Sequence, residues 1–419
     1  MERTINDGGT EGGFLDAKGA SALLGVKPET LYAYVSRGLL RSVPSPEGRG
    51  HGYSRTDLER LKARSDARAG HGPVAGAALR WGEPVLDSSL TALGAEGPRY
   101  RGQLATELAE RDVPFEAVAE LLWTGSLPEL ATPFRAGRPK LSAKKLSSLL
   151  ADGAPLLAGA QLALAAIAAQ DFAGYGVPLS TELARARSLI ATLAAAPALS
   201  RAPERFDRAL AEDDVARAVI VALGGRPRAA SAAAMNRALV LCADHELNVS
   251  TFAARITASG GADLYACVTA ALAALTGPRH GGACDRVEAL VAETGEPTRA
   301  RAVVHDRTRR GESVPGFGHP LYPKGDPRAD QLIDLARSIN GKASVVRTLM
   351  ALVRVMRDEG REPPTLDVGL VAVCAALGLP YGAPVCIFAL GRSAGWIAHV
   401  FEQRTDAHML RPRARYVGV

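Results

Sequence analysis

The sequence has few aromatic residues and few cysteines, and each shortage narrows the class of protein. Phe, Trp and Tyr make up only 5% of the 419 residues. The five cysteines are scattered, odd in number and without a CxxC pair, which argues against a disulfide framework and favours reduced, buried thiols. Apolar stretches such as AQLALAAIAAQ are too short to span a bilayer, and the polar N-terminus lacks the apolar region of a signal peptide. We therefore expect a cytoplasmic protein.

The remaining composition is that of a helical globular protein. Apolar residues make up 47% and charged residues 22% of the chain, with a bias toward alanine that favours helices. The length is sufficient for two or three domains. The net charge of +6 permits an anionic partner but does not require one.

Residues 1–66 are predicted to form a separate module, followed by a Gly- and Ala-rich linker at 67–79. Two short helical patterns meet at Gly25, and Pro28 suits the first position of the second helix. A Gly-rich stretch that suits a small wing and a third helical pattern, TDLERLKAR, follow. This order resembles the winged helix-turn-helix module of MerR-type and excisionase-type proteins, in which the second helix enters the major groove of DNA.

That resemblance implies a set of DNA contacts: Lys27, Thr30, Tyr32, Arg37, Arg49 and Arg55. Between residues 27 and 64 there are eight basic and four acidic residues. This excess of positive charge is smaller than a strong phosphate-binding surface shows. The alternative is a helical module that packs on the main domain or on another protein.

From about residue 80 to the end, alanine-rich helical patterns alternate with Gly and Pro breaks, so the body is predicted to be mainly α. Polar segments interrupt this apolar background. The stretch VPGFGHPLYPKGDPRAD, residues 314–330, holds three glycines and four prolines, which no regular helix or central strand tolerates. It is therefore predicted to be a rigid loop that presents His319 and Arg328. Other polar segments carry His245, His280, Asp367 and Arg392.

Histidine and aspartate perform acid–base chemistry near neutral pH, and arginine binds carboxylates through two hydrogen bonds. Together they suit a small polyanionic substrate that gains and loses protons. A His/His/Asp metal site is the competing interpretation. It is disfavoured because no two of these residues have the spacing of a helical ligand pair and because the arginines would repel a cation.

The polar segments resemble, in order, the motifs of the citrate synthase family. The matching segments are YRGQLATELAERDVPFEAVAELLWTGSLP, DHELNVST, GPRHGGA, GFGHPLYPKGDPRA, PTLDVGLV, GRSAGWIAHVFEQ and RPRARYVG. The resemblance covers roughly residues 80–419. It implies a mainly α fold with a large helical domain at 80–280 and 373–419, and a small helical domain at 281–372.

The resemblance also implies an acyltransferase that condenses acetyl-CoA with oxaloacetate and releases citrate and CoA. Asp367 would remove a methyl proton, His280 would bind the thioester oxygen, and His319 would protonate the keto oxygen. His245, Arg328, Arg392 and, from the partner subunit of a homodimer, Arg411 would hold oxaloacetate. Acyl-CoA would be a co-substrate, and neither a metal nor a resident cofactor is expected.

The sequence departs from the family pattern on the CoA side of the site. Pro320 and Pro323 stand where many family members have Arg and Lys. We expect Lys324, or Arg279 beside His280, to contact a CoA phosphate instead, with solvent-facing charges as the alternative. Two other functions stay open. The chain could use propionyl-CoA and make 2-methylcitrate, or it could be a DNA-binding regulator that uses the citrate-synthase-like body as a metabolite sensor.

Overall fold

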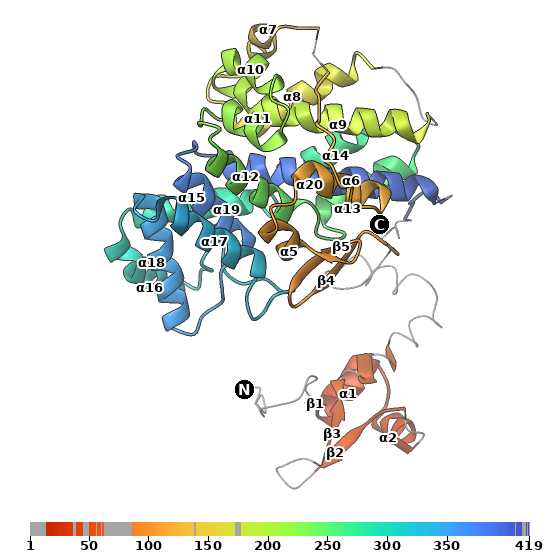
Figure 1. Ribbon diagram of the computed structural model, residues 1–419. Helices are drawn as coiled ribbons and strands as arrows, with labels where there is room; N and C mark the ends of the chain where they lie inside the picture. The colour runs from red at the N-terminus through yellow and green to blue at the C-terminus, as the bar shows by residue number, and fades with distance from the viewer. Residues whose placement is uncertain are drawn as a thin grey trace. The chain divides into compact units, whose positions relative to one another are not determined.

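The computed structural model describes residues 14–36, 39–44, 50–55, 57–59, 61–62, 86–137, 140–171, 177–406, 408–412, 416 and 418. It divides into two compact units, Met1–Asp87 and Ser88–Val419 (Figure 1). The predicted linker at 67–79 lies outside the described residues. The division of the body into a large and a small domain stays a prediction.

The first unit combines short helices with a small antiparallel sheet. Its first helix begins after Asp16, whose side chain accepts the Gly19 N–H at 2.7 Å, and it ends at Gly25 in the left-handed conformation (φ 63°). The sheet has the strand order β1-β3-β2, and β3 lies in the Gly-rich segment predicted to form the wing, while its partner β2 directly precedes that segment. The named elements are β1 (Phe14–Leu15), α1 (Ala17–Leu24), α2 (Pro28–Ser36), β2 (Ser42–Pro44) and β3 (His51–Ser54).

This small unit has a hydrophobic core of its own. Ala20 and Leu31 from the two helices pack with Leu40, Tyr53 and Leu58, all nearly inaccessible to solvent. The predicted helix–turn–helix with a following wing is therefore present in the described part of the module. Of the predicted DNA contacts, Arg37 and Arg49 lie outside the described residues.

The second unit is mainly α, as predicted. It opens with a small antiparallel sheet, which the sequence did not reveal: β4 (Thr91–Gly94), β5 (Gly97–Tyr100) and β6 (Gln103–Leu104). Its helices are α5 (Ala105–Glu110), α6 (Phe115–Thr124), α7 (Ala143–Ser147), α8 (Leu156–Ala168), α9 (Leu179–Ala195), α10 (Phe206–Leu210), α11 (Val215–Ala222), α12 (Ala229–Cys242), α13 (Val249–Ser259), α14 (Leu264–Leu275), α15 (Gly282–Thr294), α16 (Ala300–Arg309), α17 (Pro327–Asn340), α18 (Ser344–Asp358), α19 (Leu366–Ala376) and α20 (Ala383–Thr405). Short 3₁₀ turns are η1 (Ala196–Ser200), η2 (Pro203–Arg205) and η3 (Pro297–Arg299).

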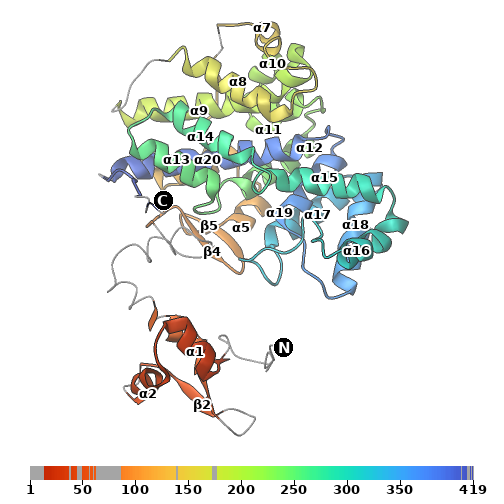
Figure 2. The same ribbon diagram turned by 180° about the vertical axis from the view of Figure 1, so that it is seen from behind.

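Helix α20 runs through the middle of this unit and packs against α6, α12, α13, α14 and α19 (Figures 1 and 2). It is long and apolar enough to cross a membrane by length and composition alone, yet 89% of its most apolar stretch is buried inside the unit. That burial is typical of a central core helix. Its buried side chains include Arg392 and His399, which place polar groups in the core.

Helices α15–α19 gather on one side of the unit in both views (Figures 1 and 2). A second hydrophobic cluster, separate from the main core, joins Leu290 of α15 to residues of α16 and α18. Helices α17 and α19 approach closely at Gly369, where an added Cβ would lie 2.7 Å from the Cβ of Leu332. This contact fixes the start of α17, which carries Arg328, relative to the start of α19, which carries Asp367.

Candidate active site

His280 lies in the turn before α15, with its ring held from outside that helix. Its Nε2 atom is 2.8 Å from the Ser250 hydroxyl, which also accepts the Trp396 indole N–H at 3.0 Å and lies 2.7 Å from Asn248 Oδ1. Burial, followed by the nearby Arg392 charge, lowers the pKa of His280 to about 4. His280 is therefore neutral at pH 7 and carries one N–H, which is on Nδ1 when the Ser250 hydroxyl donates to Nε2 and on Nε2 when that hydroxyl donates to Asn248.

His245 and His319 face each other across the candidate site. Their ring centroids are 5.6 Å apart at 83°, and the His245 Nε2 atom lies 2.9 Å from the Tyr322 hydroxyl. Burial is the main cause that lowers the pKa of both histidines, and the Arg328 charge adds to it. Both rings are therefore neutral near pH 7.

The His319 loop is tied to the segment before Asp367. The Gly318 N–H donates to the Pro363 carbonyl at 2.9 Å, and the Thr365 N–H donates to the Gly316 carbonyl at 2.8 Å. Gly316 has φ 85°, and a Cβ there would meet Val287 and Val368 side chains at 2.5 and 2.7 Å. Only glycine fits this position, so the rigid loop predicted from the sequence is held in place by backbone contacts and close packing.

Two buried arginines bring positive charge to the cluster. Arg328 is 2% exposed and forms a two-point ion pair with Asp326 at 2.9 and 2.8 Å, while its Nη1 atom has no partner among the described residues. Arg392 is 1% exposed and donates through Nε to the Cys242 carbonyl at 2.9 Å. The Arg328 charge lowers the pKa of Arg392, after burial, so the two cations lie near each other. Asp326 and Asp244 also lie near these arginines, but the Arg328 Nη1 atom without a partner among the described residues suits an anionic ligand.

Asp367 stands in the first turn of α19 with a donor at each oxygen. The Thr365 hydroxyl lies 3.1 Å from Oδ2, and the Cys284 thiol lies 3.1 Å from Oδ1. The negative charge of Asp367 acts to raise the pKa of His319, although burial lowers it overall, so the carboxylate and this ring share one site. The structure thus brings His245, His280, His319, Arg328, Arg392 and Asp367 into one cluster.

Comparison with known families explains this arrangement. The model of the "Citrate synthase, C-terminal domain" family matches residues 78–413.

The chain belongs to the citrate synthase family.

Its relatives carry two kinds of name. The chain is 36% identical to citrate synthase 2 of Bacillus subtilis over 198 residues, which is 46% of this chain and 53% of that protein. It is 30% identical to a 2-methylcitrate synthase of Shewanella oneidensis over 363 residues, which is 83% of this chain and 96% of that protein. The family is one of condensing acyltransferases, so the predicted fold and enzyme class are confirmed.

A solved structure of the same fold is the citrate synthase of Thermoplasma acidophilum. It superimposes with a TM-score of 0.70 at 26% identity, covering 80% of this chain and 94% of that one, and it was solved as a ternary complex with carboxymethyl coenzyme A and oxaloacetate. A second family model, for MerR helix-turn-helix regulatory proteins, matches residues 17–69. Both resemblances inferred from the sequence are therefore confirmed.

The remaining predicted residues of this citrate synthase family member lie on its surface. Arg279 and Lys324 are exposed, and neither has a hydrogen bond or ion pair among the described residues. Arg411 is also exposed, and the roles predicted for all three stay predictions. In the part of the chain that the structure describes, no group of His, Cys, Asp and Glu is arranged to hold a metal ion.

Several side chains of the cluster were not predicted from the sequence. Tyr322 lies in the His319 loop. Its place in the sequence, shortly after two glycines and a histidine, was the one available sign that it belongs to the site. Ser250 and Cys284 reach the site through contacts between distant segments, whereas Asp326 pairs with Arg328 two residues later. Ser250 lies in the identified segment DHELNVST and Cys284 directly follows GPRHGGA, but their roles depend on which neighbour each one faces.

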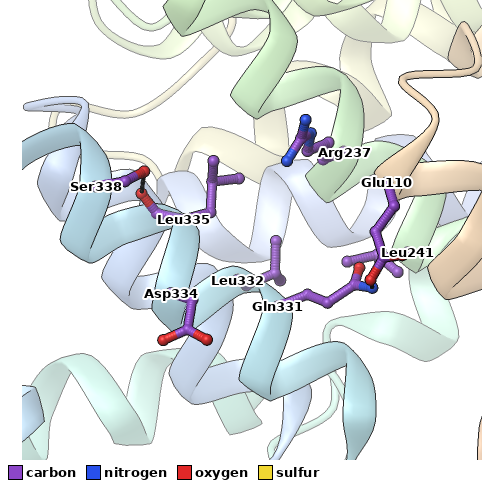
Figure 3. Close-up of a pocket in the computed structure, with 8 residues that line it drawn as sticks. All are labelled: Glu110, Arg237, Leu241, Gln331, Leu332, Asp334, Leu335 and Ser338. Atoms are coloured by element: carbon purple, nitrogen blue, oxygen red, sulfur yellow. Dashed lines mark hydrogen bonds between the residues drawn. The ribbon is translucent and has the colours of Figure 1, made fainter.

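A cavity of about 330 Å³ lies between α5, α12 and α17, and none of the predicted site residues lines it. Figure 3 shows Leu332 and Leu335 rising from α17 into this space, while Gln331 and Glu110 meet at one end. Its only lining cation, Arg237, is already paired with Asp112 at 2.7 Å. This cavity is therefore separate from the cluster around Asp367.

Proposed function

We propose that this chain condenses an acyl-CoA with oxaloacetate, with acetyl-CoA as the leading donor and propionyl-CoA as the alternative. One water is consumed, and the products are free CoA with citrate or 2-methylcitrate. The observation that carries the proposal is the combination of neutral histidines, a carboxylate and two buried arginines in a single cluster. Family membership points to the same chemistry.

Proton removal from the acyl donor is assigned to Asp367 and His280. A proton next to a thioester is very weakly acidic, so a carboxylate alone cannot remove it at a useful rate. His280 would donate a hydrogen bond to the thioester oxygen and stabilise the enol as it forms. Its lowered pKa of about 4 supports this role, because a neutral ring whose Nε2 accepts from the Ser250 hydroxyl carries its N–H on Nδ1, where it can donate to the thioester.

Oxaloacetate binding is assigned to Arg328, Arg392 and His245. The buried Nη1 atom of Arg328 without a protein partner supports a carboxylate contact, since a buried guanidinium donor is costly to leave unpaired. We assign a further contact to Arg411 of the partner subunit, which requires a homodimer. The Tyr322 hydroxyl, hydrogen-bonded to His245, would orient that ring.

Carbon–carbon bond formation is assigned to the enol carbon attacking the keto carbon of oxaloacetate, while His319 donates a proton to the keto oxygen. Water then hydrolyses the thioester and CoA leaves. Arg279 and Lys324 would contact CoA phosphates, which is consistent with their exposure and lack of protein partners among the described residues. We expect no resident cofactor, and we place the reaction in the cytoplasm.

A thiol-release assay with acetyl-CoA and with propionyl-CoA tests this function. We expect CoA release that depends on oxaloacetate, and the ratio of the two kcat/KM values assigns the donor. One methylene changes binding by only about 1–3 kcal/mol, so both donors should react to a measurable extent. No release with either donor, in protein that binds oxaloacetate, would overturn the proposal.

We infer a second function, DNA binding, for the first unit. The MerR-type match at residues 17–69 favours it, and Lys27 and Tyr32 are exposed on or next to α2. Arg55 is exposed but paired with Glu59 at 2.9 Å, which weakens its predicted role. Mobility shift with DNA from the gene's own promoter tests this: binding should weaken as salt rises. Absence of salt-dependent binding would favour a protein-packing role for the module.

A further inference from the structure

The thiol of Cys284 contacts the carboxylate assigned as the catalytic base. Its Sγ atom lies 3.1 Å from Asp367 Oδ1, and Cys284 is only 2% exposed. Cys284 stands in the first turn of α15 and Asp367 in the first turn of α19, and these helices pack against each other. This contact was not predicted from the sequence, in which Cys284 is one of five scattered cysteines.

We propose that Cys284 is a positioning residue for proton abstraction, whose S–H group orients Asp367 through a weak hydrogen bond. The proposal rests on the function proposed above, in which Asp367 removes the proton from acyl-CoA. It concerns a residue that touches the base and not the substrate.

A thiol suits this role because it is a weak hydrogen-bond donor. A base in a pocket must be held in one orientation, but each strong donor to its oxygens stabilises the carboxylate and makes it a poorer proton acceptor. The Thr365 hydroxyl already lies at Oδ2. A second hydroxyl or amide at Oδ1 would weaken the base further, whereas a thiol fixes the oxygen at a smaller loss of basicity.

The thiol remains a donor throughout the working pH range. Burial, followed by the Asp367 charge, raises the pKa of Cys284 well above its usual value. Two further buried thiols, Cys242 and Cys374, act on Cys284 in the same direction. Cys284 is therefore protonated, and able to donate, near pH 7.

The same short segment also carries the enol donor. His280 and Cys284 are four residues apart at the start of α15, so one helix end sets the positions of both the hydrogen-bond donor and the base. Proton abstraction requires the base at the proton next to the thioester and the donor at the thioester oxygen. A contact from this helix to Asp367 keeps their separation constant.

Other charged groups near Asp367 lie outside this contact. The Asp367 charge acts to raise the pKa of His319, which lies in the loop, and that of Cys242, which lies on α12. The charges of Arg328 and Arg392 act to lower the pKa of Cys242, and the charge of Asp326 acts to raise it. A substitution at position 284 leaves all of these groups in place. A change in the pH profile can therefore be attributed to the lost or altered contact with Asp367.

Two substitutions are expected to move the pH profile in opposite directions. Cys284→Ala leaves Asp367 Oδ1 without its thiol donor, so the carboxylate loses stabilisation and the acid limb of kcat/KM moves about half a unit or more to higher pH. Cys284→Ser places a stronger donor at Oδ1, so the limb moves to lower pH and the plateau kcat falls about threefold or more. Both profiles are measured for acyl-CoA at saturating oxaloacetate.

Cys267→Ala is the matched control. Cys267 is also fully buried, but its thiol faces the Ala262 carbonyl at 3.7 Å. Its removal should lower stability like any buried truncation and leave the profile unchanged. If both Cys284 variants keep the wild-type limb and plateau in an active enzyme, the positioning role is wrong. If the wild type releases no CoA, the proposed function is wrong instead, and the positioning role falls with it.

Infrared spectroscopy tests the contact without turnover. The wild-type minus Cys284→Ala difference spectrum isolates the S–H stretching band of Cys284. We expect this band to move to higher frequency in the Asp367→Asn background, because a neutral amide is a weaker acceptor than a carboxylate. A band that stays in place would show that the thiol does not donate to Asp367.

Discussion

His280 and Ser250 are hydrogen-bonded across the core of the second unit, with 2.8 Å between Nε2 and the hydroxyl oxygen. Ser250 is inaccessible to solvent and also accepts the Trp396 indole N–H. It lies 2.7 Å from Asn248 Oδ1, so its position is set from three sides. The His280 ring is therefore held by a side chain that belongs to another helix, α13.

Ser250→Ala should lower kcat by about 10- to 100-fold with little change in the KM for oxaloacetate. The variant leaves His280 in place but removes the contact that orients its ring, and small misplacements of a catalytic group are costly. Steady-state kinetics with both substrates varied measures this. Ser188→Ala is the control: Ser188 lies on α9, and its hydroxyl accepts the Gly137 N–H. Equal losses in both variants would count against a specific role of Ser250.

Arg328→Lys should raise the KM for oxaloacetate about tenfold, and Arg328→Gln about 100-fold. Lysine keeps the charge but loses the planar fork, whereas glutamine also leaves Asp326 buried without its cation. Arg185→Lys, which alters another buried arginine that is paired with two acids, serves as the control. A KM that stays at the wild-type value in both Arg328 variants would contradict the assigned carboxylate contact.

His280 should make unfolding take up protons in mildly acidic solution. Its pKa is about 4 in the folded chain and about 6.5 when unfolded, so the unfolded state binds more protons between these values. The contribution of the neutral His280 ring to the free energy of unfolding is thus fully present above about pH 6.5 and is lost as the pH falls toward 4. Calorimetry at pH 5 in buffers of different ionisation enthalpy should give nearly one proton more for wild type than for His280→Asn. Equal uptake by the two proteins would show that the folded ring is not held neutral.

Gly369→Ala should destabilise the second unit by about 1–3 kcal/mol, because the new methyl group would crowd Leu332 and the Ala329 carbonyl. The change should also raise the KM for oxaloacetate, since it pushes the start of α17 away from α19. Chemical denaturation and kinetics measure the two effects. Gly260→Ala, at φ −79° with its nearest contact at 3.5 Å, is the control and should be tolerated. A Gly369→Ala protein as stable as wild type would mean that the helices separate without cost.

Sequence reasoning identified the residues that carry chemical groups better than those that orient them. His280, His319 and Asp367 interrupt apolar helical patterns with polar, Gly- or Pro-rich segments, which is visible in one dimension. The partners Ser250 and Cys284 look like ordinary helix residues, and their roles come from long-range packing of α13 and α15. The small β4-β5-β6 sheet was also missed, because its strands have only two to four residues and show no clear alternation.

The surface residues show a different limit of sequence reasoning. Arg279 and Lys324 were selected because Pro320 and Pro323 replace expected basic residues, and both are exposed. A CoA phosphate contact is made to another molecule, so no contact within a single chain reveals it. The same holds for a contact that Arg411 would make with a partner subunit. These assignments therefore depend on binding measurements.

The most direct measurement compares wild type with Asp367→Asn for CoA release and for oxaloacetate binding in the same preparation. The account predicts that the variant binds oxaloacetate with a Kd within a few-fold of wild type, because Arg328 and Arg392 are unchanged. It also predicts that CoA release with the preferred donor falls about a thousandfold, as expected for loss of a general base. Release at the wild-type rate in a variant that binds oxaloacetate normally would contradict the assignment of Asp367 as the base.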